Sequence, residues 1–139
     1  MSIHSRLVIG ILTGFLLISC DPTGYEQRAL NEARQSRVTG DISMLETMIE
    51  LYEKEHGGLP TSDQGLKALV EKPTGENAPK NWVKLMKVVP VDHWDREYQY
   101  LPTPKGDGRS SSQYDIWSNG PDGESGTADD IGNWENGTL

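Results

Sequence analysis

One long helical pattern runs through the first half of this 139-residue chain and restricts what it can fold into. Between Tyr25 and His56, apolar residues recur at steps of four, three, four and three, which places them on one face of an α-helix. These residues are Val38, Ile42, Leu45, Ile49 and Tyr52. Residues 26–37 are mostly polar, so we expect that half to project into solvent as a stalk. Gly57-Gly58 ends the helix, and Pro60 prevents it from resuming.

The segment that follows predicts a second, short helix. Thr61-Ser62-Asp63-Gln64 matches a capping box, with Thr61 as the N-cap and Gln64 at the third helical position. The side chains that we expect to face inward from this helix are Leu66, Leu69 and Val70. A proline-bounded loop, residues 73–79, comes after it.

Three later segments have the composition or the alternation of β-strands. Residues 85–91 are apolar and partly β-branched, with Pro90 marking the end or the edge of a strand. Residues 97–101 alternate, and residues 114–118 form another clear strand pattern after a long turn-rich loop. The alternation places Tyr98 and Tyr100 on one strand face. The sequence therefore predicts an α+β fold, in which the long N-terminal helix packs on a small antiparallel β-sheet.

The last quarter of the chain, Ser118 to Trp134, combines glycines with closely spaced carboxylates and has no helical or strand periodicity. The three carboxylates, Asp122, Asp129 and Asp130, repel one another unless a cation lies between them. An all-oxygen, flexible, glycine-supported segment suits Ca²⁺ best. We therefore expect an irregular C-terminal calcium loop. A solvated acidic turn is the alternative, because Pro121-Asp122-Gly123 is a good turn sequence by itself.

The N-terminal residues are typical of an export signal. Arg6 precedes a short apolar stretch, which is too short to span a bilayer comfortably and ends at Cys20. This ending resembles a bacterial lipobox, in which the cysteine becomes the first residue and carries diacylglycerol. Cys20 is the only cysteine, so it cannot form an internal disulfide. An ordinary secretory signal, or an uncleaved anchor with a coincidental cysteine, is the alternative.

These features divide the chain into a lipoprotein signal peptide at 1–19, a lipidated tether at 20–24 and a globular domain at 25–139. The expected location is a membrane, held by the lipid anchor and facing the periplasm. Asp21 resembles a signal for retention at the inner membrane.

The charge and the absence of catalytic motifs exclude several classes of function. The formal net charge is −8, and it becomes more negative if Arg6 is removed with the signal peptide. Such a surface disfavours nucleic acid and anionic lipid headgroups. The sequence has no Ser-His-Asp order, His-Glu-x-x-His, Cys-x-x-Cys or phosphate-binding glycine loop. We expect the chain to be no enzyme and to have no small-molecule substrate.

Three segments in order resemble one known family. Residues 59–73 resemble its run Tyr-Pro-Thr-x-x-Gln-Gly-Leu-x-Ala-Leu, and residues 90–100 resemble Pro-x-Asp-Pro-Trp-Gly-x-Pro-Tyr-x-Tyr. The third segment is the acidic run that closes on residues 130–134. In the second segment, His93, Asp95 and Glu97 stand where the family usually has Pro, Gly and Pro. The family is the major pseudopilin of the type II secretion system, whose globular domain is pilin-like.

The resemblance implies a calcium site and a role in secretion. In that family the closing loop binds calcium through aspartates and backbone carbonyls. The implied ligands are the side chains of Asp122, Asp129 and Asp130, with the carbonyls of Asn119 and Thr127. The implied partners are pseudopilins or other type II secretion components. The alternative is a lipoprotein that reuses the scaffold to bind a glycan or a peptide outside secretion.

The N-terminus departs from the family pattern. A pseudopilin begins with a basic leader, a glycine cleavage site and a long apolar helix with Glu at its fifth mature position. Gly14-Phe15 resembles the cleavage junction, but the fifth residue counted from Phe15 is Ser19, and the apolar run stops at Cys20. We therefore expect a lipid in place of the filament-building helix, and polymerisation is not assumed.

Overall fold

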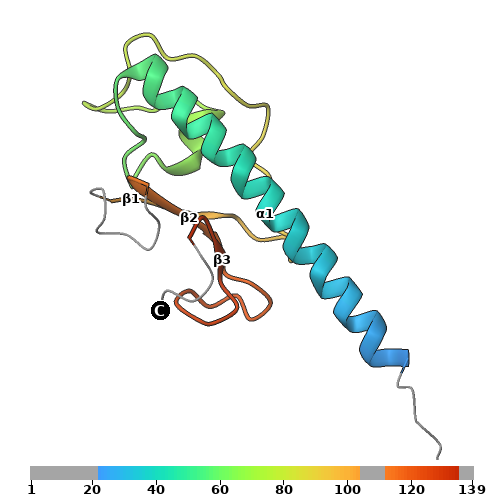
Figure 1. The fold of residues 1–139 in the computed structure, drawn as a ribbon. Coiled ribbons are helices and arrows are strands. Elements are labelled where there is room, and N and C mark those ends of the chain that lie inside the picture. Colours follow the sequence, from blue (N-terminus) through green and yellow to red (C-terminus); the bar gives the residue numbers. More distant parts are fainter. Residues whose placement is uncertain (1–21, 104–111, 135–139) are drawn as a thin grey trace, which may run out of the picture.

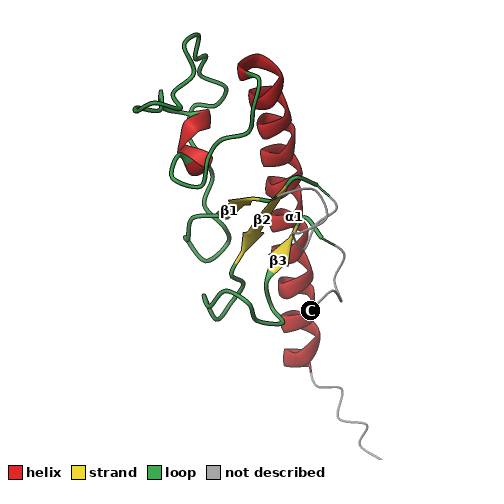
Figure 2. Cartoon of the chain, turned by 90° about the vertical axis from the view of Figure 1, so that its left-hand side faces the viewer, coloured by secondary structure: helices red, strands yellow, loops and turns green. Residues whose placement is uncertain are grey.

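The computed structural model describes residues 22–103 and 112–134. One long helix lies beside a small sheet and its connecting loops (Figures 1 and 2). The elements in chain order are helix α1 (Pro22–His56), 3₁₀-helix η1 (Gly65–Leu69), and strands β1 (Gln99–Pro102), β2 (Tyr114–Ser118) and β3 (Ile131–Gly132). The strands follow the order β1-β2-β3, and both pairs are antiparallel. This arrangement confirms the predicted α+β fold.

Helix α1 has the predicted apolar face. All five residues of the predicted stripe are buried, the most exposed of them, Ile42, at 3%. Residues 24–33 and 35–37 are exposed, so the predicted stalk is solvated except at Arg34, which is half-buried. Gly57 adopts a φ of 78° and donates its N–H to the carbonyl of Glu53 at 2.7 Å. This left-handed glycine ends the helix where the sequence predicts.

The capping box is present, but it precedes a 3₁₀-helix. The Thr61 N–H donates to Oε1 of Gln64 at 3.0 Å, and the Gln64 N–H donates to Oγ1 of Thr61 at 3.3 Å. Leu66 and Leu69 are buried as predicted, whereas Val70 is only half-buried. Residues three apart share a face in a 3₁₀-helix, so Val70 is rotated away from that face.

The prediction of a strand at residues 85–91 is wrong. The N–H groups of Leu85 and Met86 both donate to the carbonyl of Leu69, which holds this segment against η1 instead of in a ladder. Pro90 has no N–H to donate, and only Val91 makes an isolated bridge, to Glu97. Leu85, Met86 and Val89 are therefore half-buried by packing against the core and not by sheet pairing, whereas Val88 and Val91 are exposed.

The sheet contains one strand that the sequence did not predict. Residues 114–118 form β2 as expected, and β1 begins two residues later than predicted. The additional strand β3 pairs Gly132 with Trp117 and Ile131 with Ser118. Because β3 lies directly after the acidic segment, that segment is held at both ends by the sheet.

Tyr98 and Tyr100 share one face of the β1 segment, as predicted, and both hydroxyls are hydrogen-bonded. Tyr98 donates to Oδ2 of Asp41 on α1 at 3.0 Å, and Tyr100 donates to the carbonyl of Pro60 at 2.9 Å. Burial raises the pKa of both tyrosines above the ordinary value. These contacts join the β1 segment to α1 at Asp41 and to the segment after α1 at Pro60.

Among the described residues, no helix is both long enough and apolar enough to cross a membrane. Cys20, Asp21 and the segment 1–19 lie outside the residues that the structure describes, as do residues 104–111 of the predicted loop.

Candidate metal-binding loop

The acidic loop, defined as residues 119–130, joins β2 to β3 and lies below the sheet in Figure 1. It consists of two turns. In the first, the Gly123 N–H donates to the carbonyl of Asn119 at 3.2 Å. In the second, the Asp130 N–H donates to the carbonyl of Thr127 at 3.4 Å. Both carbonyls that the resemblance implies as ligands therefore accept turn hydrogen bonds, and each retains a second lone pair.

Asp129 connects the two turns of the loop. Its Oδ2 accepts the N–H of Asp122 at 3.1 Å, and its Oδ1 accepts the hydroxyl of Thr127. The bond from Thr127, followed by that from the Asp122 backbone, lowers the pKa of Asp129. Gly120 makes this approach possible, because a Cβ there would lie 2.7 Å from Oδ2 of Asp129 and closer still to its carbonyl. The structure therefore brings Asp129 to the backbone of the first turn.

The other two carboxylates also accept backbone hydrogen bonds. Asp122 is exposed, and its Oδ1 accepts the N–H of Glu124 at 2.8 Å. Asp130 is 7% exposed, and its Oδ2 accepts the N–H of Gly126 at 2.8 Å. Across residues 22–103 and 112–134, no three acidic, histidine or cysteine side chains gather closely enough to hold one metal ion. The donor set suits Ca²⁺ because it is all oxygen, but the three carboxylates do not converge in this arrangement.

A buried carboxylate outside the loop holds its entrance, and sequence reasoning did not assign it to the site. Asp92 is 3% exposed; its Oδ1 accepts the N–H groups of Trp94 and Arg96, both at 2.9 Å. Its Oδ2 accepts the hydroxyl of Ser118 at 2.6 Å. Ser118 in turn accepts the N–H of Gly120 at 3.2 Å. The sequence does contain one indication that Asp92 has a role, because Asp92 matches the family pattern in residues 90–100.

Arg96 is the second residue that sequence reasoning missed. Its Nη1 donates to the carbonyl of Gly120 at 2.7 Å, and its Nη2 donates to the carbonyl of Pro121 at 3.0 Å. Arg96 occupies a variable position of the resembling motif, so no pattern in the sequence connects it with a loop 24 residues away.

The two ends of the acidic loop are tied to the rest of the domain. The Trp117 indole N–H donates to Oδ1 of Asn119 at 2.8 Å and to Oγ of Ser125 at 3.1 Å. After β3, Asn133 donates from Nδ2 to Oε1 of Glu46 on α1 at 3.1 Å. The acidic loop is therefore hydrogen-bonded to β2 at its start, and the residues that follow it are hydrogen-bonded to α1.

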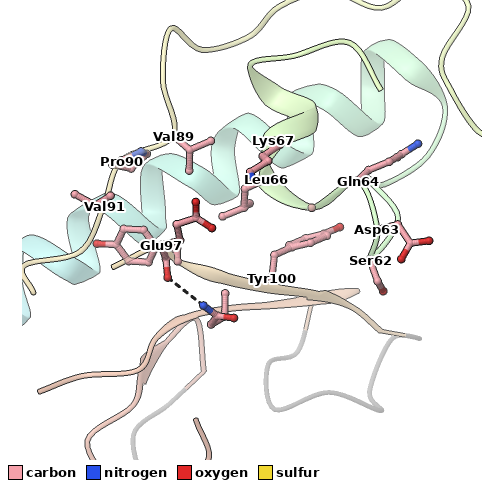
Figure 3. A pocket seen from close by; sticks show the side chains of 13 residues that line it. Ser62, Asp63, Gln64, Leu66, Lys67, Val89, Pro90, Val91, Glu97 and Tyr100 are labelled. Atoms are coloured by element: carbon pink, nitrogen blue, oxygen red, sulfur yellow. Dashed lines mark hydrogen bonds between the residues drawn. The ribbon is translucent and has the colours of Figure 1, made fainter. Parts of the chain in front are cut away.

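A separate pocket of about 350 Å³ lies between η1, residues 89–91 and β1 (Figure 3). Its lining mixes apolar side chains, such as Leu66 and Val89, with the charged residues Asp63, Lys67 and Glu97. Its lining residues include no histidine and no cysteine. None of the residues that line this pocket belongs to the acidic loop.

A long helix packed on a small antiparallel sheet, with an acidic loop closed by the last strand, defines a pilin-like domain. The sequence profile of the family described as "Type II secretion system (T2SS), protein G" matches residues 27–134. The chain belongs to this family.

Individual relatives agree with this assignment. Type II secretion system core protein G of Pseudomonas aeruginosa is 37% identical over 139 residues, covering 94% of this chain and 90% of that protein. Core protein G of Escherichia coli K12 is 35% identical over 130 residues, covering 92% of this chain and 82% of that protein. The crystal structure of the major pseudopilin from the type 2 secretion system of enterohaemorrhagic Escherichia coli matches with a TM-score of 0.68 and 35% identity. This structural match covers 93% of this chain and 98% of that chain.

Family membership decides several of the expectations drawn from the sequence. The relatives are structural pseudopilins and not enzymes, so the prediction of a non-enzymatic chain is confirmed. Membership also implies contacts with other type II secretion components, and it does not favour a glycan- or peptide-binding module. Pseudopilins of this system are periplasmic proteins associated with the inner membrane. The alignment with the Pseudomonas protein covers so much of this chain that it reaches into the segment 1–19.

Proposed function

We propose that this chain is a membrane-anchored, calcium-binding pseudopilin of type II protein secretion, which acts through protein–protein contacts at the periplasmic face of the inner membrane. The observation that carries the calcium part is the position of Asp129. Its carboxylate lies against the Gly120 and Asp122 backbone, between the two turns of the acidic loop.

The loop residues are suited to Ca²⁺ in kind and in charge. Asp122, Asp129 and Asp130 would hold the ion, with the carbonyls of Asn119 and Thr127 as additional oxygen donors. A bound Ca²⁺ supplies the positive charge that offsets their mutual repulsion. The three carboxylates would turn toward one ion, because they do not converge in the present arrangement. The loop would then be cross-linked between β2 and the two-residue strand β3, which has few hydrogen bonds of its own.

The calcium proposal is tested by melting the purified chain in CaCl₂ and in a chelator. A ligand that binds only the native state raises the unfolding midpoint, and saturation at 100 times Kd corresponds to about 2.7 kcal/mol. We expect a higher midpoint in calcium and a much smaller rise for Asp122→Ala. Glu124→Gln is the matched control, because it removes a neighbouring charge that is not a proposed ligand. Equal midpoints for the unmodified chain in both buffers would rule out the site.

The membrane part of the proposal assigns the anchor to a lipid on Cys20, with Asp21 favouring the inner membrane. The exposed first turns of α1 support it, because they would space the sheet from the bilayer without being buried. Cys20→Ser should abolish acylation, as read by mass spectrometry of the membrane fraction, and release the chain from the membrane. A variant that remains membrane-bound would instead point to an uncleaved apolar anchor within 1–19.

A further inference from the structure

We propose that Arg96 is a positioning residue for the acidic loop, holding its first turn in the form that binds the divalent cation. This inference rests on the calcium site of the proposed function. It assigns a role to a side chain that is not itself a ligand.

The guanidinium of Arg96 fits the first turn in two ways. Its two terminal nitrogens donate to consecutive carbonyls, those of Gly120 and Pro121, at 2.7 and 3.0 Å. A planar guanidinium can make two such bonds at once, and an ammonium cannot reproduce that fork. The guanidinium also lies against Gly123, where an added Cβ would be 2.8 Å from Cζ. Arg96 therefore contacts the first turn from its first glycine to its last.

Arg96 is itself held in place by a tight turn. Its N–H donates to Oδ1 of Asp92 at 2.9 Å, and its carbonyl accepts the N–H of Asp92 at 2.8 Å. Asp95, between them, adopts a φ of 60°. Asp92 also accepts the hydroxyl of Ser118, the last residue before the loop. The same turn thus fixes both the arginine and the start of the segment that the arginine holds.

The charge of Arg96 and its two hydrogen bonds to the loop should affect calcium affinity in opposite directions. A cation beside a calcium site repels Ca²⁺, so removing its charge should strengthen binding if charge were its only effect. Removing the two hydrogen bonds frees the turn and should weaken binding, because the loop must then be ordered when calcium binds. The sign of the change in calcium affinity therefore separates the two roles.

Arg34 provides a matched control for charge. It lies on α1 and lines, with Asp129, Trp94 and Pro121, a cavity of about 100 Å³ between the helix and the loop. Its Nε is buried and has no hydrogen-bond partner among the described residues. Arg34→Gln removes a positive charge near the same carboxylate without removing a bond to the loop backbone.

The test compares the full chain with Arg96→Lys, Arg96→Gln and Arg34→Gln, all purified in the same detergent. Calorimetric titration with CaCl₂ gives the affinity. Both Arg96 variants should bind about tenfold more weakly, as expected for the loss of hydrogen bonds from a charged donor. Arg34→Gln should bind as tightly as the unmodified chain or more tightly. Arg96→Lys that binds as tightly as the unmodified chain would overturn the proposal.

A second measurement, made in chelator, does not depend on calcium. The Trp117 indole N–H bonds to Asn119 and Ser125 of the loop, so its NMR signal reports whether the loop is ordered. The signal should shift and exchange faster in both Arg96 variants and remain unchanged in Arg34→Gln. If the unmodified chain binds no calcium, the proposed calcium site is wrong. The Trp117 signal still shows whether Arg96 orders the loop, and a signal that is unchanged in both Arg96 variants would rule out that role.

Discussion

The carboxylate of Asp92 and the hydroxyl of Ser118 lie 2.6 Å apart, although 26 residues separate them in sequence. This buried bond joins the turn that carries Arg96 to the last residue of β2. The acidic loop begins at the next residue, so its entrance has a fixed position before any ion is bound. A loop whose first residues are already fixed has fewer conformations to lose when it binds an ion, so fewer ligands are enough to hold the ion.

Replacing Asp92 should destabilise the domain more than any single change in the loop. Asp92→Ala leaves the N–H groups of Trp94 and Arg96 and the hydroxyl of Ser118 without their acceptor. An unpaired buried donor costs about 1–3 kcal/mol, and two of these three donors are only partly buried, so we expect a loss of about 3 kcal/mol in urea unfolding. Ser118→Ala removes only one of the bonds to Asp92, together with the acceptor of the Gly120 N–H, so it should cost less than Asp92→Ala. Equal losses for the two variants would contradict the central role of Asp92.

Asp95 should be replaceable by glycine without loss of stability. Its φ of 60° is a left-handed conformation, and the family motif usually has glycine at this position. Left-handed backbone costs an L-residue about 1–2 kcal/mol, less for Asp than for branched residues. Asp95→Gly should raise the melting temperature slightly or leave it unchanged, and Asp95→Val should lower it. A clearly lower melting temperature for Asp95→Gly would mean that the Asp95 side chain makes a stabilising contact.

Two glycines of the acidic loop should tolerate alanine differently. Gly120 and Gly126 have φ values of 60° and 89°, so alanine is strained at both, by about 1–2 kcal/mol. Only at Gly120 does the added Cβ also meet Asp129, whereas at Gly126 nothing lies within 4 Å. Gly120→Ala should therefore be the less stable variant and should lose calcium-dependent stabilisation, measured by melting with and without CaCl₂. Equal behaviour of the two variants would mean that the approach of Asp129 is unimportant.

Stability should fall in alkali because several tyrosines have raised pKa values. Burial raises the pKa of Tyr98, Tyr100 and Tyr114 above the ordinary value of 10.0. Above that pH the unfolded chain loses tyrosine protons that the native chain retains, so unfolding is favoured as the pH rises. The melting temperature should decline from about pH 10 upward. Tyr100→Phe should reduce the decline, and an identical pH profile would contradict this origin.

The sequence is sufficient to predict the features that a sustained pattern specifies. The stripe from Val38 to Tyr52 extends over several helical turns, so the helix and its buried face are unambiguous. The strand at 114–118 is short, but three of its five residues, Tyr114, Ile116 and Trp117, are strong strand formers. Both patterns are local, and packing in the folded chain does not change them.

The features that sequence reasoning missed depend on contacts between distant segments. The segment 85–91 has strand composition, but its N–H groups at Leu85 and Met86 meet the carbonyl of Leu69 on η1. The strand β3 has only two residues, too few for any periodicity. Arg96 acts on Gly120 and Pro121, and no pattern in the sequence indicates that these residues are close.

A crystal structure of the full chain grown in CaCl₂ tests the central claim most directly. The account predicts one calcium peak in the acidic loop, bound by carboxylate oxygens of Asp122, Asp129 and Asp130, with Arg96 still donating to the carbonyls of Gly120 and Pro121. An acidic loop without a calcium peak, in which Asp130 still accepts the N–H of Gly126 and Asp122 that of Glu124, would contradict it.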